Sequence, residues 1–277
     1  MDEPLVSICI PCYNASPFIA DTIASVLKQT YTNIEINISD DCSTDHTLDI
    51  IRTFNDSRIN IYINKINLGP SGNYNQALSY AKGEFTKLLC ADDLIYPDCI
   101  ADQVAIFQKN KEGNIVLVTA NKDIINEAGK QVFAKSFPGK KGFIQGKAAI
   151  KKSIRKGTNI FGEPGLPLFK TEIIDKKDYI ITDKYYTYIN DFDLWCKILI
   201  HGNLYVIDKK LFAFRIVSSS VTSNTKWKQA ICFQDYIKML SIDKRYNLTS
   251  FDLFSGKVMS WAMCFARNLV FKFYFKK

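Results

Sequence analysis

The chain has 277 residues, of which 47% are hydrophobic and 23% charged, so it can bury a sizeable core and is unlike disordered or low-complexity chains. No run of eighteen apolar residues indicates a transmembrane span, and the acidic start at residues 1–4 lacks the basic segment typical of a secretory signal. Eight cysteines lie mostly inside apolar runs, which predicts reduced, buried thiols in a cytoplasmic protein.

Positive charge is concentrated in two segments. The formal net charge is +8, from 36 basic and 28 acidic residues. Residues 128–162 contain nine basic residues and no acidic one, and residues 253–277 contain five more, again with no acidic one. Such segments attract anionic partners such as phosphates or lipid headgroups. A nucleic acid partner is not expected, because no recognised nucleic-acid-binding motif accompanies the charge.

The first half of the sequence alternates short apolar runs with segments of helical periodicity. The apolar runs predict strands at residues 6–10, 34–39, 59–63, 85–90 and 115–119. Between them we expect a helix capped within residues 14–17, a second capped within 43–45, a loop over 67–72 before a third helix, and a fourth opened by Pro97. This alternation predicts an α/β fold with a mostly parallel sheet and helices on both faces.

The second half is less regular. Residues 162–167 are rich in turn formers, residues 190–195 predict a helix start, and residues 211–217 predict a strand. The tail from residue 251 predicts a helix with an apolar stripe flanked by basic residues. Such a helix either lies on an anionic bilayer or packs back on the domain. The stripe is formed by Phe254, Val258, Trp261, Phe265 and Leu269.

Two pairs of acidic residues, 40–41 and 92–93, follow predicted parallel strands. Ligands of such sheets bind beyond the carboxyl ends of the strands. Asp92 and Asp93 suit a hard divalent cation, which prefers oxygen ligands, although acids are also common in solvated turns. Asp41 is a candidate acceptor in a nucleotide pocket or a helix-capping residue. Tyr13 is a candidate for stacking on a base or a half-buried core residue.

Two other kinds of site are disfavoured by spacing. Cys9 and Cys12 form a single CxxC with no second pair, and the two histidines lie far away in sequence, which argues against a zinc or redox site. No GxGxxG follows the first strand, so a nicotinamide-type dinucleotide site is not expected.

Several ordered blocks resemble the inverting family-two glycosyltransferases, which have the GT-A fold. The blocks are residues 6–14 (VSICIPCYN), 40–45 (DDCSTD), 67–69 (NLG) through 83–84 (GE), 91–93 (ADD), 190–195 (NDFDLW) and 214–222 (FRIVSSSVT). The resemblance implies a Rossmann-like, mostly parallel sheet flanked by helices, with a C-terminal helical extension. It divides the chain into a GT-A catalytic domain (1–222, with a nucleotide-binding half 1–120 and an acceptor half 121–222) and an extension (223–277).

The resemblance also implies roles for the matching residues. Asp41 would accept a hydrogen bond from the base, Asp93 would bind Mn²⁺ or Mg²⁺ bridging the donor diphosphate, and Asp191 would be the general base. The full nucleotide-binding set is Pro11, Tyr13, Asn14, Asp41, Gly69, Asn75 and Asp92. Candidate contacts to the acceptor or diphosphate are Glu163, Trp195 and Arg215.

The sequence departs from the family pattern at three positions. Asn190 stands where a Glu is usual, Tyr74 where an Arg is frequent, and Val217 where many relatives have a His. Asp193 is an alternative to Asp191, and Asp191 itself could be a helix cap or a surface acid. A carboxylate is a weak base towards a sugar hydroxyl, so it helps mainly as that hydroxyl loses its proton in the transition state.

These features predict a metal-assisted, inverting hexosyl- or N-acetylhexosaminyltransferase. We expect it to move one sugar from a nucleotide-diphosphate sugar, with UDP favoured, to a hydroxyl of a glycan or lipid-linked glycan in bacterial surface polysaccharide or O-antigen biosynthesis. We expect it in the cytoplasm, peripheral at the inner face of the cell membrane. The alternatives are a non-catalytic nucleotide- or carbohydrate-binding module and a nucleotidyltransferase. The sugar, the linkage and the oligomeric state stay open.

Overall fold

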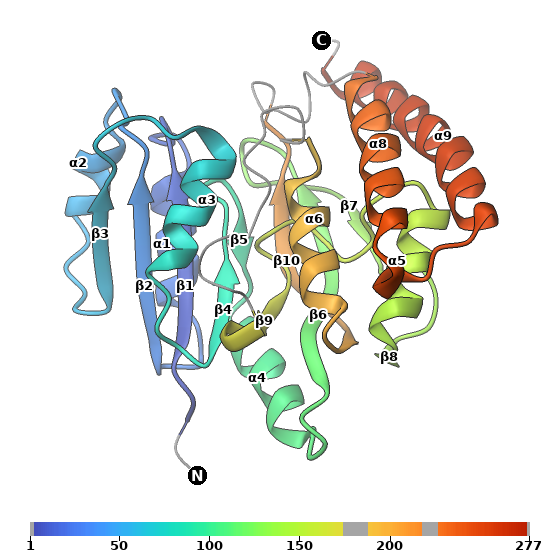
Figure 1. Ribbon diagram of the computed structural model, residues 1–277. Coiled ribbons are helices and arrows are strands. Elements are labelled where there is room, and N and C mark those ends of the chain that lie inside the picture. The colour runs from blue at the N-terminus through green and yellow to red at the C-terminus, as the bar shows by residue number, and fades with distance from the viewer. Residues whose placement is uncertain (1–2, 174–187, 218–226, 276–277) are drawn as a thin grey trace.

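A single mixed sheet runs through the protein (Figure 1). The computed structural model describes residues 3–173, 188–217 and 227–275. Within these residues, ten strands pair in the order β3-β2-β1-β4-β9-β6-β10-β5, with β7 beside β6 and β8 beside β10. The strands are β1 (Val6–Cys12), β2 (Ile34–Asp40), β3 (Ile59–Ile63), β4 (Phe85–Leu88), β5 (Leu94–Ile95), β6 (Ile115–Ile125), β7 (Gln131–Lys135), β8 (Gly142–Ile144), β9 (Leu168–Lys170) and β10 (Asn203–Arg215).

The long strands of this sheet are parallel. β1 pairs in parallel with β2 and with β4, β2 with β3, and β6 with β10, whereas the short strands β5, β7, β8 and β9 pair antiparallel. Parallel strands place their carboxyl ends at one edge of a sheet, where ligands bind. The expected mostly parallel sheet is thus confirmed.

Helices cover both faces of the sheet. The helices are α1 (Ile19–Leu27), α2 (Thr47–Arg52), α3 (Gly69–Ser79), α4 (Cys99–Lys109), α5 (Gly146–Arg155), α6 (Asn190–Leu199), α8 (Lys228–Ile242) and α9 (Ser250–Phe275), with short 3-10 turns η1 (Thr171–Ile173) and η3 (Lys244–Tyr246). One core joins α1, α2 and α4 to the sheet, and a second joins α3, α5, α6 and α8 to its other face. In β1, Ile8 and Ile10 enter the first core and Cys9 enters the second, as the alternation of a strand requires.

Several element boundaries differ from the sequence-based expectations. β6 runs to Ile125 rather than residue 119, so the expected division at residues 120–121 falls inside a strand. β10 begins at Asn203 rather than residue 211. The loop expected over residues 67–72 is already helical from Gly69, with Pro70 in the first turn of α3. The end of the block at 214–222 lies outside the described residues.

The C-terminal helices pack beside each other at one side of the sheet (Figure 1). α9 contacts both α8 and α5. Asp252 in its first turn is fully buried and accepts hydrogen bonds from Arg155 of α5 and from Thr249. Gly256 and Gly157 allow the close approach of α9, since an added Cβ would meet backbone of the facing segment at 2.9 Å or less. The expected extension is therefore a helix pair anchored on the domain.

Candidate active site

The carboxyl ends of β1 and β2 are fixed by a side chain that the sequence reasoning passed over. Asn73 of α3 is buried, and its amide donates to the carbonyls of Cys12 (3.2 Å) and Ser39 (3.0 Å). Its oxygen accepts from the Ser39 hydroxyl at 2.8 Å. Asn75, the expected binding residue, lies one half-turn further along α3 and is only partly buried.

Asp41 is tied to the start of α3. Its carboxylate accepts from the backbone amides of Leu68 (2.8 Å) and Gly69 (3.0 Å) and from the Asn64 side chain (2.8 Å). An acid at this position satisfies free amides at the helix N-terminus and complements its dipole. This explains why α3 begins at Gly69, which has a φ of +72°, a conformation that suits glycine. Asp41 is thus a capping residue, but of α3 rather than of α2.

The segment after β1 presents the expected aromatic residue to solvent. Pro11 is buried in β1, whereas Tyr13 is 52% exposed. Asn14 has a φ of 47° and is fastened to the loop after β2, because its amide donates to Ser43 (3.0 Å) and its side chain accepts from Thr44 (2.8 Å). The two loops are therefore joined beneath an exposed Tyr13 ring.

Asp92 and Asp93 lie just beyond β4, beside Cys90. One sulfur and two carboxylate oxygens of these residues lie within 4.8 Å of one another. Burial raises the pKa of Asp93 well above its ordinary range, and the nearby Asp92 raises it further. Burial and the adjacent acids also keep the pKa of the Cys90 thiol high, so it stays protonated, with Tyr74 Oη 3.2 Å from its sulfur. Two crowded carboxylates fit Mn²⁺ or Mg²⁺, which would relieve their repulsion; the neutral thiol is a poor ligand for either.

Arg215, the last residue of β10, holds the acidic loop in place. Its backbone amide donates to Asp93 Oδ1 (2.9 Å) and its Nε to the carbonyl of Asp92 (2.8 Å). Its remaining nitrogens donate to the carbonyl of Glu127 (2.8 Å) and to Asp21 (3.2 Å). The side chain is 1% exposed. The expected direct contact of Arg215 with a diphosphate is therefore not supported, because protein groups occupy the guanidinium, and Arg215 is a positioning residue.

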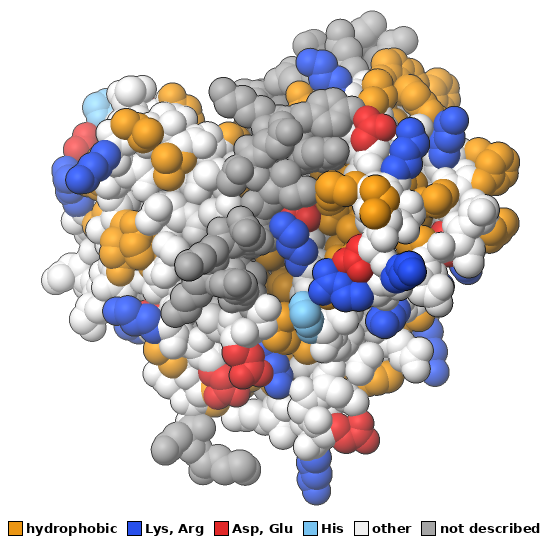
Figure 2. Space-filling view, in the orientation of Figure 1, with side chains coloured by type: hydrophobic (Ala, Val, Ile, Leu, Met, Phe, Trp, Pro, Cys, Tyr) orange, Lys and Arg blue, Asp and Glu red, His pale blue; other side chains and the backbone are white. Residues whose placement is uncertain are grey.

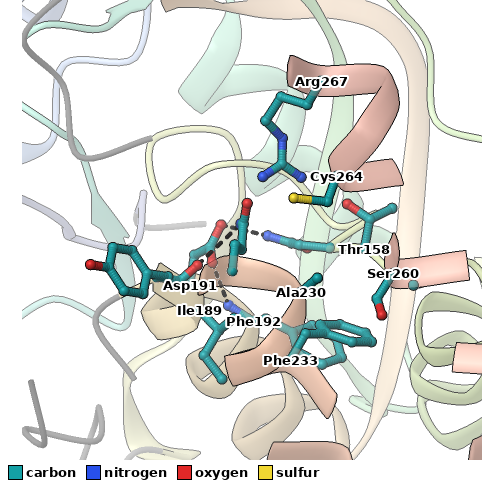
Figure 3. Close-up of a pocket in the computed structure, with 13 residues that line it drawn as sticks. Thr158, Ile189, Asp191, Phe192, Ala230, Phe233, Ser260, Cys264 and Arg267 are labelled. Carbon is teal, nitrogen blue, oxygen red and sulfur yellow. Dashed lines mark hydrogen bonds between the residues drawn. The ribbon is translucent and has the colours of Figure 1, made fainter. Parts of the chain in front are cut away.

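The two candidate bases on α6 have different surroundings. Asp193 is buried and occupied, since Lys197 lies 2.9 Å from one oxygen and Tyr236 donates to the other at 2.8 Å. Asp191 instead lines a pocket, drawn in Figure 3, where Asn159 donates to its Oδ2 at 2.7 Å. Burial raises the pKa of Asp191, while the bond from Asn159 lowers it. This geometry favours Asp191.

A buried ion pair lies near both acidic sites. Lys122 of β6 pairs with Glu163, and Lys122 is 7% exposed. Burial lowers the pKa of Lys122 well below its ordinary range, and the charge of Lys135 lowers it further; Asp93 and Asp191 act in the opposite direction. Glu163, which was expected to contact the acceptor or diphosphate, thus forms an ion pair with Lys122. Lys122 in turn lies near Asp93, the candidate metal ligand, and Asp191, the candidate base.

Trp195 belongs to the core and not to the binding surface. It is fully buried, packs edge-on against Phe169, and donates from its indole nitrogen to the carbonyl of Gly162 at 3.0 Å. This buried position does not support the expected contact of Trp195 with the acceptor. Trp195 supports the loop around Glu163, together with the buried Lys87, which donates to the carbonyls of Gly165 (3.0 Å) and Leu166 (3.0 Å).

One departure from the family pattern, Asn190, links two helices. Asn190 donates to Ser71 of α3 at 2.8 Å, so the start of α6 is held against α3, and its own Oδ1 is buried without a hydrogen-bond partner. Asn159, Lys122 and Asn73 are site residues that the sequence reasoning missed. Asn159 and Lys122 are single polar residues without a motif around them, whereas Asn73 lies within the block that runs from residues 67–69 to 83–84.

Comparison with known proteins shows the family and the fold of the chain. The chain belongs to the family described as Glycosyl transferase family 2, whose profile matches residues 7–174, and it is a glycosyltransferase of GT-A fold. The nucleotidyltransferase and the non-catalytic module are thereby set aside.

One sequence relative and two solved structures illustrate what the chain is similar to. A UDP-Glc:alpha-D-GlcNAc-diphosphoundecaprenol beta-1,3-glucosyltransferase, WfgD of Escherichia coli, is 33% identical over 237 residues, covering 83% of each chain. The structure of S. aureus TarS 1-349 in complex with UDP-GlcNAc has a TM-score of 0.69 at 19% identity, covering 96% of this chain and 73% of that one. A mannosyltransferase from Pyrobaculum calidifontis in complex with GDP-Man and Mn²⁺ has a TM-score of 0.67 at 15% identity, covering 98% and 74%.

Proposed function

We propose that the protein transfers one sugar, with inversion, from a UDP-sugar to a hydroxyl of a sugar carried on a lipid diphosphate. The observation that carries this proposal is the position of Asp191, a partly buried carboxylate that faces a pocket and is held by Asn159. The lipid-linked acceptor is supported by the activity of the relative WfgD, and the UDP donor by that activity and by the TarS complex with UDP-GlcNAc.

The donor's place is the carboxyl edge of β1, β2 and β4. Asp41, Tyr13 and the amides around Asn14 surround the ends of β1 and β2, where a base and ribose would lie. Asp92 and Asp93 would hold Mn²⁺ or Mg²⁺, which when bound stabilises the negative charge of the departing diphosphate. Arg215 keeps both acids at the edge through its bonds to the Asp93 carboxylate and the Asp92 carbonyl.

The reaction assigns one proton transfer to Asp191. The acceptor oxygen forms a bond to the anomeric carbon, and the bond from that carbon to the UDP oxygen breaks, so UDP leaves with the bonding pair. Asp191 takes the proton of the acceptor hydroxyl as the hydroxyl oxygen forms its bond to the anomeric carbon. Because attack and departure occur on opposite faces of the carbon, an α-linked donor gives a β-linked product.

The test replaces each of two acidic site residues and compares the variants with a substitution at an exposed acidic residue. Asp191→Asn should lower transfer about a thousandfold or more, from the loss of the general base and of its charge, while Mn²⁺-dependent stabilisation by UDP persists. Asp93→Asn should abolish both transfer and the Mn²⁺ dependence of UDP stabilisation. Asp49→Asn, at an exposed position on α2, should change neither. Full transfer by the Asp191→Asn enzyme would overturn the assignment of the base.

We further propose that the α8–α9 pair rests on an anionic bilayer. Within the described residues, no helix has the length and hydropathy needed to cross a membrane. Figure 2 nevertheless shows hydrophobic side chains gathered over these helices with basic side chains nearby. Apolar residues recur on the exposed face of α9. Exposed lysines accompany them, Lys257 on α9 and Lys228 at the start of α8. The exposed apolar residues of α9 are Phe251, Phe254, Val258, Met259, Trp261, Phe265 and Leu269.

An exposed apolar face beside basic residues fits an interfacial helix better than a solvated one. Vesicle sedimentation tests this. The double variant Phe254→Ser/Phe265→Ser should lose most binding to vesicles containing phosphatidylglycerol, whereas Phe143→Ser, at a similarly exposed position in β8, should bind normally. Wild-type binding should also weaken with salt. Unchanged vesicle binding by the double variant would overturn the proposal. A concentration-dependent dimer that the double substitution abolishes would also overturn it, because the apolar face would then be a contact between two copies of the chain.

A further inference from the structure

The pocket beside Asp191 is closed by the C-terminal helices (Figure 3). Asp191 and Phe192 of α6 form one wall, Gln229 and Phe233 of α8 another, and Arg267 reaches in from α9. Figure 3 shows Arg267 and Cys264 on α9 above the α6 residues. The reaction as proposed uses Asp191 and Asn159 and leaves the groups from α8 and α9 without a role.

Two polar atoms of this pocket are buried without hydrogen-bond partners. They are Nη1 of Arg267 and Oε1 of Gln229. Burial lowers the pKa of Arg267, and the negative charge of Asp191 acts in the opposite direction. An arginine stays charged in proteins, so a buried, unpartnered guanidinium nitrogen is costly unless a ligand supplies an acceptor. No ion pair to Arg267 occurs in the described ranges.

A second pocket adjoins the first across Thr158 and Asn159, which line both. It encloses about 720 Å³, counting space open to solvent, against about 330 Å³ for the first. Its walls combine Lys135 and Lys156 with apolar side chains. The apolar side chains include Phe137, Ile160, Leu166, Met259 and Met263.

The cations of the two pockets lie close enough to affect each other. Lys135 is exposed at the surface; desolvation nevertheless lowers the pKa of its ammonium, and the charge of Arg267 lowers that pKa further. Lys135, like Arg267, has no acidic partner in the described part of the chain. Two like charges held near each other, neither of them in an ion pair within the described residues, favour the binding of an anion, even though Asp191 also lines the pocket of Arg267. The mixture of cations with an apolar wall indicates an anion joined to an apolar group.

We propose that Arg267 and Lys135 bind the diphosphate of the lipid-linked acceptor. This inference rests on the proposed function and deepens it, because it names the residues that recognise the acceptor. The acceptor sugar then lies toward Asp191, with Gln229 Oε1 available to a sugar hydroxyl, and the first part of the lipid chain lies against Met259 and Met263. The same helix α9 thus contributes the anion-binding residue and, on its exposed face, the membrane contact.

Calorimetry on the full chain in detergent and EDTA tests this without requiring turnover. The probes are geranylgeranyl diphosphate, geranylgeraniol and inorganic pyrophosphate; EDTA removes cation-dependent binding at the donor site. The wild type should bind geranylgeranyl diphosphate more tightly than either other probe. Arg267→Gln and Lys135→Gln should each weaken that binding about tenfold or more and leave geranylgeraniol unaffected, as expected for a lost charged hydrogen bond. Arg267→Lys should recover part of the loss.

Lys147→Gln is the matched control, because Lys147 is an exposed lysine of the same basic segment that lines neither pocket. It should bind all probes as the wild type does. Unchanged diphosphate binding in the Arg267 and Lys135 variants, or an equal loss for the alcohol, would overturn the proposal. Pyrophosphate binding as tight as geranylgeranyl diphosphate would overturn the lipid acceptor in favour of a free diphosphate. Stabilisation by UDP with Mn²⁺, measured separately, reports on the donor site. A failure of the proposed function can therefore be distinguished from a failure of this inference about the acceptor.

Discussion

Asn159 Nδ2 donates a hydrogen bond of 2.7 Å to Oδ2 of Asp191 and another of 2.8 Å to the carbonyl of Gly162. One amide group therefore joins the loop after α5 to the candidate base on α6. Burial raises the pKa of Asp191, and the bond from Asn159 opposes that rise. Asn159 thus favours the ionised form of the carboxylate and holds its orientation.

Replacing Asn159 with Leu should shift the acid limb of the activity profile to higher pH. The substitution removes a bond that stabilises the ionised carboxylate, so the pKa of Asp191 rises and less of it is ionised at a given acidic pH. The pH dependence of kcat/KM measures this. Activity should approach the wild-type value as pH increases. A uniform loss at every pH would instead indicate that Asn159 acts only through structure.

Substituting Arg215 with Gln should weaken metal and donor binding more than it slows transfer at saturation. Its Nε and Nη bonds to Asp92, Glu127 and Asp21 are lost, while the backbone bond to Asp93 remains. The Mn²⁺ concentration needed for half-maximal UDP stabilisation should rise about tenfold, because residues that hold metal ligands in place commonly contribute about 10- to 100-fold to metal affinity. Arg58→Gln, in a local pair with Asp56, serves as the control. Equal Mn²⁺ dependence in both variants would contradict the positioning role.

Lys87→Met should destabilise the fold strongly for a single substitution. The buried ammonium donates to the carbonyls of Gly165, Leu166 and Pro167, which would lose their partner inside the core. We expect a loss of about 2 kcal/mol or more in unfolding free energy. Lys82→Met, at an exposed position, should change it by no more than about 0.5 kcal/mol. Denaturant unfolding at neutral pH distinguishes the two.

Asp252→Asn should loosen the attachment of α9, and its effect should depend on pH. Burial alone would raise the pKa of Asp252, but hydrogen bonds from Thr249 and Arg155 lower it below the ordinary value. A lowered carboxyl pKa stabilises the folded state above the unfolded-state pKa, and this contribution is lost as pH falls through the folded-state value. The variant should therefore be less stable than the wild type at pH 7, by about 1.5 kcal/mol, and approach it at about pH 3 or below. Thermal unfolding at both pH values measures this; a constant difference would contradict it.

The sequence predicts β1 to β4 well because these strands are short, largely apolar runs, whereas β6 and β10 continue through polar residues and are longer than predicted. It also brings Asp92, Asp93 and Asp191 to notice, since strand-end acids and a short helix-start motif are local signals. The pairs Lys122–Glu163 and Asn159–Asp191 join residues 41 and 32 positions apart, where the irregular half of the chain offers no periodicity. Trp195 and Arg215 match family positions, but burial by neighbouring elements gives them supporting roles. The start of α3 was misplaced because its cap, Asp41, lies 28 residues upstream of Gly69.

The proposed contact of α9 with a bilayer has a kinetic consequence. An enzyme held at a bilayer by this contact meets its lipid-linked acceptor within a thin layer, so the rate depends on acceptor molecules per unit area of membrane rather than per volume of solution. Confinement of both reactants raises their effective concentration without any new contact at the site. Diluting the acceptor with inert lipid at constant total concentration should then slow transfer, as surface dilution does for enzymes that work on a two-dimensional substrate.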